Sequence, residues 1–205
     1  MAPMEDLWDN ISTALELSPE LSKRWLAKLR VQYSESHRHY HNEHELLRRK
    51  VSLLTGASVA LQLAALFQYY YFEADKDCMN QNCEAVSEFF SDMTLSNKML
   101  EANVKRLLGD LQSDGGDLSE SDVHFFQDLD LLVLGTPPEE YKKYTQQLRN
   151  ECPSEDIRSY DKTRLKLLLT LSRIPCIYLT KEFSEQYESL ARTNIEQEIK
   201  ELQAK

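Results

Sequence analysis

Helix start and stop signals follow one another along most of the chain, and no segment alternates apolar and polar residues as a strand does. Ser18-Pro19 looks like a helix cap followed by proline in the first turn. Gly135 ends one helix and Thr136-Pro137 begins the next, with Thr136 as its cap. Glycine and proline are few, at 5 and 6 residues, and leucine far outnumbers valine and isoleucine. The chain is therefore expected to be all-α, a single-domain helical bundle of about eight to ten helices.

The spacing of apolar residues gives approximate helix ranges. Residues 1–17 are set apart as an N-terminal segment, and residues 18–205 are expected to form the one domain. Glycine and aspartate at residues 113–117 mark a clear break. The expected helices cover residues 21–33, 46–54, 58–72, 84–93, 96–111, 119–134, 137–151, 157–172 and 180–202.

Charge and cysteine content narrow the possible environments and partners. The 34 acidic residues outnumber the 24 basic ones, and the formal net charge is −10. Such a chain is not expected to bind nucleic acid or an anionic membrane, because both need clustered lysine and arginine. The most apolar stretch, residues 59–72, is shorter than the roughly 20 residues that cross a bilayer. The first residues do not form a secretory signal, and 4 scattered cysteines fit reduced thiols. We therefore expect a cytoplasmic protein.

Four of the five histidines lie between positions 37 and 44. On a helix, His37 and His41 would share a face, and so would His41 and His44. Imidazole is a common ligand of zinc, iron and nickel, so the cluster is a candidate metal site. The alternative is a polar loop whose histidines are exposed or hydrogen-bonded.

Two aspartates interrupt an otherwise apolar helix. Asp128 and Asp130 are two residues apart and cannot face the same way on a helix, so at least one is expected to point toward the core. A buried carboxylate needs a metal, an arginine or several hydrogen-bond donors. The alternative to a metal site is a carboxylate that caps a neighbouring helix or pairs with Arg149, Arg164 or Arg192.

Seven blocks of residues, in order along the chain, carry a resemblance to a known family. They are Arg38-x-Tyr40-His41-Asn42, Ala65-Leu66-Phe67-Gln68-Tyr69, Asn82-x-Glu84-x-x-Ser87, Phe126-x-Asp128-x-Asp130-Leu131-x-x-Leu134-Gly135, Tyr141-x-x-Tyr144, Arg149-x-Glu151 and Ala191-Arg192-x-Asn194-x-x-x-Glu198-Ile199. Together the blocks resemble a predicted metal-dependent phosphohydrolase family of the HD superfamily. The resemblance implies the all-α HD fold. It also implies a divalent metal held by an adjacent His-Asp pair, an earlier histidine and a later aspartate, which activates water against a phosphate ester.

The chain departs from this family at the positions implied for the metal ligands. The late aspartate corresponds to Asp130. The early histidine falls at Glu45, and His44 lies one place short, so that it could serve only if the helix register slips. The His-Asp doublet falls at Gln68 and Tyr69. A neutral amide is a poor substitute for imidazole on a transition metal, and the phenol should fill the space of the metal and its water.

Two smaller blocks also differ from the family. A Thr and His pair that the family places near residues 110–113 is missing, and Cys83 separates Asn82 from Glu84, a pair that the family keeps adjacent. The resemblance thus predicts a degenerate pocket whose equivalent residues are His41, His44, Glu45, Gln68, Tyr69, Glu84 and Asp130.

These departures predict a catalytically inactive HD-fold protein, a pseudo-phosphohydrolase retained as a binding or scaffolding module, with no metal or other cofactor expected. Its partner would be another protein or a small phosphorylated ligand, which Arg38, Arg149 or Arg192 could hold. The alternative is a divergent phosphohydrolase that cuts a nucleotide or other small phosphoester. Its manganese, magnesium, iron or zinc ion would sit on His41, His44 and Asp130, with Glu45 or Glu84.

Overall fold

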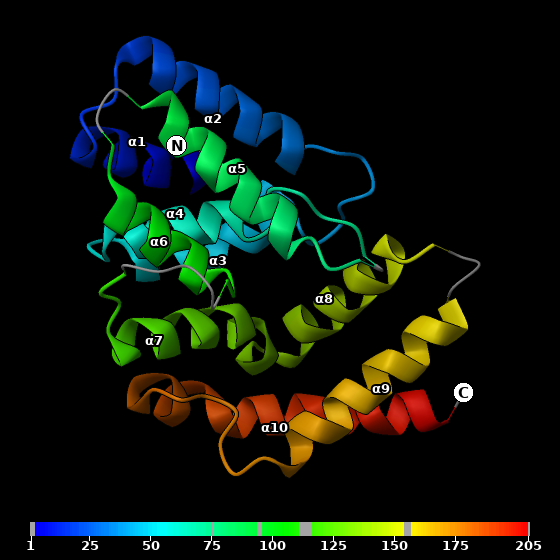
Figure 1. Cartoon of the computed structure of the whole chain (residues 1–205). Helices are drawn as coiled ribbons and strands as arrows, with labels where there is room; N and C mark the ends of the chain where they lie inside the picture. Colours follow the sequence, from blue (N-terminus) through cyan, green and yellow to red (C-terminus); the bar gives the residue numbers. More distant parts are fainter. Residues whose placement is uncertain (1–2, 75, 94–95, 111–115, 154–156, 205) are drawn as a thin grey trace. The chain divides into compact units, whose positions relative to one another are not determined.

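The computed structural model describes residues 3–74, 76–93, 96–110, 116–153 and 157–204 (Figure 1). Within these ranges the chain forms ten α-helices, one π-helical turn and one 3₁₀ turn, and no strand. The all-α prediction is therefore confirmed. The chain divides into two compact units, residues 1–119 and 120–205, and each is described by itself. The prediction of one domain over residues 18–205 stays a prediction.

The first unit is built around the most apolar helix of the chain. Its elements are α1 (Pro3–Ala14), α2 (Pro19–Tyr33), the π turn η1 (Glu43–Leu47), α3 (Arg48–Leu54), α4 (Val59–Phe67), α5 (Met79–Asp92) and α6 (Lys98–Leu107). All of residues 60–67 in α4 are buried, and α4 contacts α1, α3, α5 and α6. The aromatic core packs edge to face, with the Trp25 and Phe89 ring centroids 5.3 Å apart.

Residues 3–14 of the N-terminal segment pack in this core. They form α1, and the side chains of Met4, Leu7, Trp8 and Ile11 are at most 1% exposed. The indole of Trp8 also donates to the carbonyl of Ser22 at 3.1 Å, which joins α1 to α2. The described part of this segment thus belongs to the first unit, and residue 18 marks a turn between two packed helices.

That turn contains a strained residue. Glu16 has a φ of +50°, in the left-handed region where glycine is usual. Backbone bonds from Leu17 N to Ser12 O, at 3.0 Å, and from Glu16 N to Thr13 O, at 3.3 Å, make the end of α1 a Schellman motif. Glu16 occupies the position that a glycine would normally take in this motif.

Replacing this residue by glycine, E16G, is expected to raise the free energy of unfolding by about 0.5–1 kcal/mol. The gain is the relief of the left-handed strain, less the extra freedom that glycine has in the unfolded chain. Urea unfolding measures it. The matched control is K23G, which places glycine at an exposed position inside α2 and should lower stability by about 1 kcal/mol. A destabilised E16G variant would contradict the assignment of strain.

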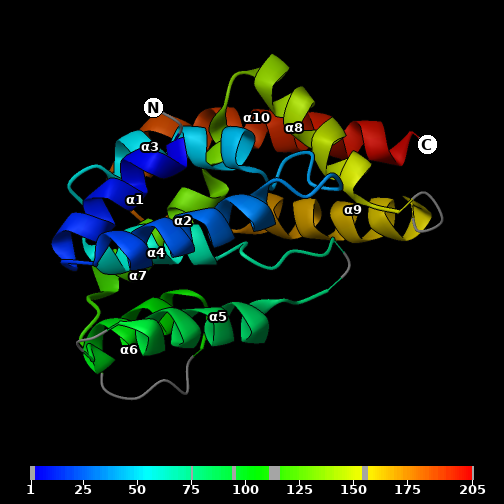
Figure 2. The ribbon, with the colours of Figure 1, turned by 90° about the horizontal axis from the view of Figure 1, so that it is seen from above.

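The second unit contains α7 (Glu120–Leu131), the 3₁₀ turn η2 (Leu132–Gly135), α8 (Pro138–Glu151), α9 (Ile157–Arg173) and α10 (Lys181–Gln203). In Figures 1 and 2, α9 and α10 lie side by side, and α10 also contacts η2. Gly135 makes this second contact possible, because a Cβ there would lie 2.6 Å from the Cβ of Tyr187. The amide of Asn194 donates to the carbonyls of Leu134 and Thr136, both at 2.8 Å, and fastens η2 to α10.

Several expected boundaries shift. The helix expected over residues 58–72 ends at Phe67, and the one expected from residue 84 begins at Met79. Thr136 does not cap α8: its hydroxyl donates to the carbonyl of Val133 at 2.7 Å, and Pro137 is the cap residue. Of the break expected at residues 113–117, only 116–117 lie within the described residues.

Candidate functional site

Arg38 lies in the loop after α2 and ties it to residues 69–70. Its buried guanidinium donates to the carbonyls of His41, Tyr69 and Tyr70, at 3.3, 2.5 and 2.8 Å. Its Nε and Nη2 atoms both lie 2.9 Å from Oε2 of Glu35. These contacts engage every nitrogen of the guanidinium, so Arg38 acts as a structural clamp between its loop and residues 69–70.

The His41 side chain is held in an aromatic cluster. Its imidazole is buried and stacks on Phe72 with the ring centroids 4.0 Å apart, while the Tyr69 ring lies 4.5 Å away. His37, in contrast, is exposed, and its Nε2 lies 3.2 Å from the carbonyl of Phe72. Of the four histidines in this stretch, His41 is packed between aromatic rings, and the other three, His37, His39 and His44, are exposed.

A π-helical turn occupies the position of the expected early histidine. Asn42 caps it by accepting a hydrogen bond from the backbone N–H of Glu45 at 3.0 Å. A π turn has one more residue than an α turn, so it changes the helix register at this point. Glu45 is buried here, and His44 is exposed.

The doublet position lies where α4 ends. Gln68 is the C-cap of α4, and the chain then turns through residues 69–72. Buried Asn82 holds this turn, since its Oδ1 accepts from the N–H of Tyr71 at 2.7 Å and its Nδ2 donates to the carbonyl of Gln68 at 2.8 Å. Glu84, two residues further along α5, is exposed because it lies on another face of the helix.

Lys50 also contacts this segment, which the sequence pattern did not predict. It is only 3% exposed, and its ammonium donates to Oε1 of Gln68 at 3.2 Å and lies 5.7 Å from the centroid of the Tyr69 ring. A signal did exist, because Lys50 occupies an apolar-stripe position between Leu47 and Leu54, spaced i, i+3 and i+7. A lysine on the apolar face of a helix predicts either that its ammonium is buried or that this face is not fully packed against the core.

A cleft of about 280 Å³ lies beside this segment. Its lining is mixed aromatic and polar, with the exposed ring of Tyr71 and the side chain of Lys76 among its walls. Lys76 is ion-paired with Glu73 at 2.5 Å. The remaining lining residues are Gln68, Tyr69, Phe72, Ala74, Asp77, Cys78, Met79, Asn82 and Leu108.

In the second unit, Asp128 is fully buried and caps a neighbouring helix. Its carboxylate accepts from the backbone N–H groups of Leu179 and Thr180, both at 2.7 Å, and from the Thr180 hydroxyl at 2.6 Å. These donors lie at the start of α10. The prediction that one aspartate of the pair points into the core is confirmed, and the capping alternative is the one observed. Asp130 is half-buried.

The two arginines proposed as phosphate ligands in this unit have protein partners. Arg149 forms an ion pair with Asp161. Arg192 donates to the carbonyls of residues 174 and 175, at 3.0 and 2.9 Å, and pairs with Glu188 at 2.6 Å. Both arginines therefore hold loops or helices of the second unit together.

Arg164 and Glu198 form a buried ion pair between α9 and α10. Arg164 Nε lies 2.9 Å from Glu198 Oε1, and Nη2 lies 3.0 Å from Oε2. The Tyr141 hydroxyl donates to the same carboxylate, and the guanidinium lies 5.4 Å from the centroid of the Tyr144 ring. Burial raises the pKa of the Tyr141 hydroxyl, although the Arg164 charge opposes this shift. The cluster holds the two helices in register.

Within the described ranges, no group of three or more His, Cys, Asp or Glu side chains is arranged to hold a metal ion. Among the same residues, no helix combines the length and apolar character needed to cross a membrane. Comparison with protein-family models, with characterised proteins and with solved structures gives no match. The fold and the contacts thus define an all-α protein whose second unit contains the buried Arg164–Glu198 ion pair, and membership of the HD superfamily stays a prediction.

Proposed function

We propose that this chain is a catalytically inactive relative of HD-superfamily phosphohydrolases that serves as a binding or scaffolding module. The observation that carries the proposal is the contact between Lys50 and Gln68. At the position where the resemblance places a metal-binding histidine, the side-chain oxygen of Gln68 accepts a hydrogen bond from a buried cation of the protein itself.

The residues at the implied site do not fit a divalent metal. A metal needs neutral imidazoles and carboxylates that are free to coordinate it. Here the ammonium of Lys50 would repel the ion, and the imidazole of His41 is packed against Phe72 and Tyr69. His44, the remaining imidazole of the implied set, is exposed. No hydrolytic step is therefore derived for this chain.

The first test asks whether the purified chain holds a metal or hydrolyses a phosphoester. We expect no stoichiometric manganese, magnesium, iron or zinc by elemental analysis. We also expect no phosphate release from generic phosphatase substrates when Mn²⁺, Mg²⁺ or Co²⁺ is added. Stoichiometric metal, or metal-dependent release of phosphate, would overturn the proposal in favour of a divergent hydrolase.

A second test isolates the role of Lys50. The variant Q68H/Y69D restores the doublet but keeps the ammonium, and we expect it to bind Mn²⁺ weakly or not at all. Adding K50M should strengthen Mn²⁺ binding by at least about tenfold, because it removes a cation that contacts residue 68 and disfavours a second positive charge there. Titration calorimetry measures both affinities.

The matched control for the change in charge is K181M in the same Q68H/Y69D background. Lys181 is 80% exposed, so solvent and salt screen its charge, and its removal should leave Mn²⁺ affinity unchanged. Equal Mn²⁺ affinity with and without Lys50 would show that the buried ammonium does not exclude the metal.

A further inference from the structure

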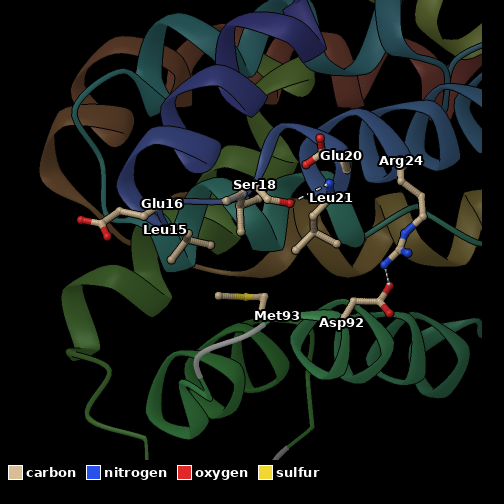
Figure 3. Close-up of a pocket in the computed structure, with 9 residues that line it drawn as sticks. Leu15, Glu16, Ser18, Glu20, Leu21, Arg24, Asp92 and Met93 are labelled. Carbon is tan, nitrogen blue, oxygen red and sulfur yellow. Dashed lines mark hydrogen bonds and ion pairs between the residues drawn. The ribbon is translucent and has the colours of Figure 1, made fainter.

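A groove of about 400 Å³ opens on the first unit, and it shares no lining residue with the cleft beside Gln68 (Figure 3). The turn between α1 and α2 forms one wall, and the C-terminal end of α5 forms the other. Figure 3 shows the side chains of Leu15 and Leu21 directed toward Met93 across the gap. The full lining is Leu15, Glu16, Leu17, Ser18, Glu20, Leu21, Arg24, Asp92 and Met93.

The groove combines an apolar floor with uncompensated negative charge. At one end Arg24 and Asp92 neutralise each other in an ion pair of 2.8 Å, and the indole of Trp25 also donates to this Asp92 at 2.9 Å. Glu16 and Glu20 line the groove as exposed side chains, and neither carboxylate has a hydrogen-bond or ion-pair partner among the described residues. The net charge of the groove is therefore negative.

The left-handed backbone of Glu16 is a second unusual feature of the groove. The left-handed turn at the end of α1 would be satisfied at lower cost by glycine, which carries no side chain. The turn instead carries a glutamate at the rim of the groove, and in Figure 3 its carboxylate points away from the gap between Leu15 and Met93. Strained backbone of this kind often accompanies a functional side chain.

We propose that this groove docks a short segment of a protein partner, one that inserts an apolar side chain between Leu15, Leu21 and Met93 and presents lysine or arginine to Glu16 and Glu20. The inference rests on the proposed function as a binding module. The volume suits one or two side chains and is small for a folded domain interface. A second copy of this chain is the less suitable occupant, because each copy carries a net charge of −10.

The test uses random 12-residue peptides displayed on phage and selected against the full chain. Enriched sequences should place an apolar residue within about three positions of lysine or arginine. Synthetic copies of them are titrated by calorimetry. Against E16Q/E20Q we expect affinity to fall by about five- to tenfold and to lose much of its salt dependence, since two charge contacts are removed. Against M93D we expect a loss of at least tenfold.

Two further variants separate docking from folding. The control E182Q/E196Q removes two exposed carboxylates from α10 and should leave peptide affinity unchanged. The variant E16G should raise the unfolding midpoint by roughly 2–4 °C and yet weaken peptide binding, a combination that a purely structural role for Glu16 would not produce.

Three results would overturn the inference: no enriched peptides, enriched peptides without basic residues, or equal binding to E16Q/E20Q and the unaltered chain. A dimer in sedimentation experiments that M93D abolishes would instead assign the groove to self-association. None of these results affects the metal and phosphatase measurements, so failure of the docking inference and failure of the proposed function remain distinguishable.

Discussion

Replacing Arg164 by methionine is expected to lower the free energy of unfolding of the second unit by about 3–5 kcal/mol, the largest effect of any substitution considered. The variant R164M would leave the carboxylate of Glu198 buried without its cation. Only the Tyr141 hydroxyl would still donate to it among the contacts described. The attraction between the guanidinium and the Tyr144 ring would be lost as well.

Urea unfolding followed by far-UV circular dichroism measures this effect, together with hydrogen exchange of α10. Both tryptophans, Trp8 and Trp25, lie in the first unit, so their fluorescence reports on that unit separately. The control R164L/E198L removes both charges and should be less destabilised than R164M, because no unpaired charge remains. A loss below about 1 kcal/mol in R164M would show that the cluster does not hold α9 to α10.

Removal of the Asp128 carboxylate is expected to be the second most damaging change, at about 2–4 kcal/mol. The variant D128A would leave the backbone N–H groups of Leu179 and Thr180 without their acceptor in a buried site. It would also remove a negative charge from the N-terminus of the 23-residue helix α10, where the helix dipole favours an anion. Thermal unfolding followed by circular dichroism measures the loss.

Two further variants show how much of the stability lost in D128A comes from each hydrogen bond to Asp128. T180V removes only the hydroxyl bond and should cost about 1 kcal/mol. D128N keeps one acceptor oxygen and should fall between T180V and D128A. If D128A unfolds at the same temperature as the unaltered chain, Asp128 does not act as the cap of α10.

The helices of this protein are predictable from sequence because their signals are local. Ser18 caps α2 with a bond from the N–H of Leu21 to its hydroxyl at 3.2 Å, as the Ser-Pro pair predicts. The expected helix over residues 58–72 was too long because its end depends on distant groups. Arg38 and Asn82 bind the carbonyls and N–H groups of residues 68–71, and these bonds compete with continuation of α4.

The candidate site was less predictable than the fold. The residue pattern predicted that one of the two aspartates is buried, and Asp128 is that residue, while the predicted pocket around Gln68 stays a prediction. It did not identify Lys50 as the partner of Gln68, nor the backbone of residues 179–180 as the partner of Asp128. Arg149, Arg164 and Arg192 were all plausible partners of a buried aspartate, and each binds other groups instead.

The sequence alone determined the helical class, most helix starts, and the requirement that a carboxylate beside Leu129 be satisfied in the core. These follow from contacts within about four residues, which local propensity encodes. Tertiary structure decided which groups meet: Lys50 and Gln68 are 18 positions apart, and Asp128 and Leu179 are 51. Such pairs form only when packing brings their helices together, and burial then makes each partner necessary, because a buried polar group without one is costly.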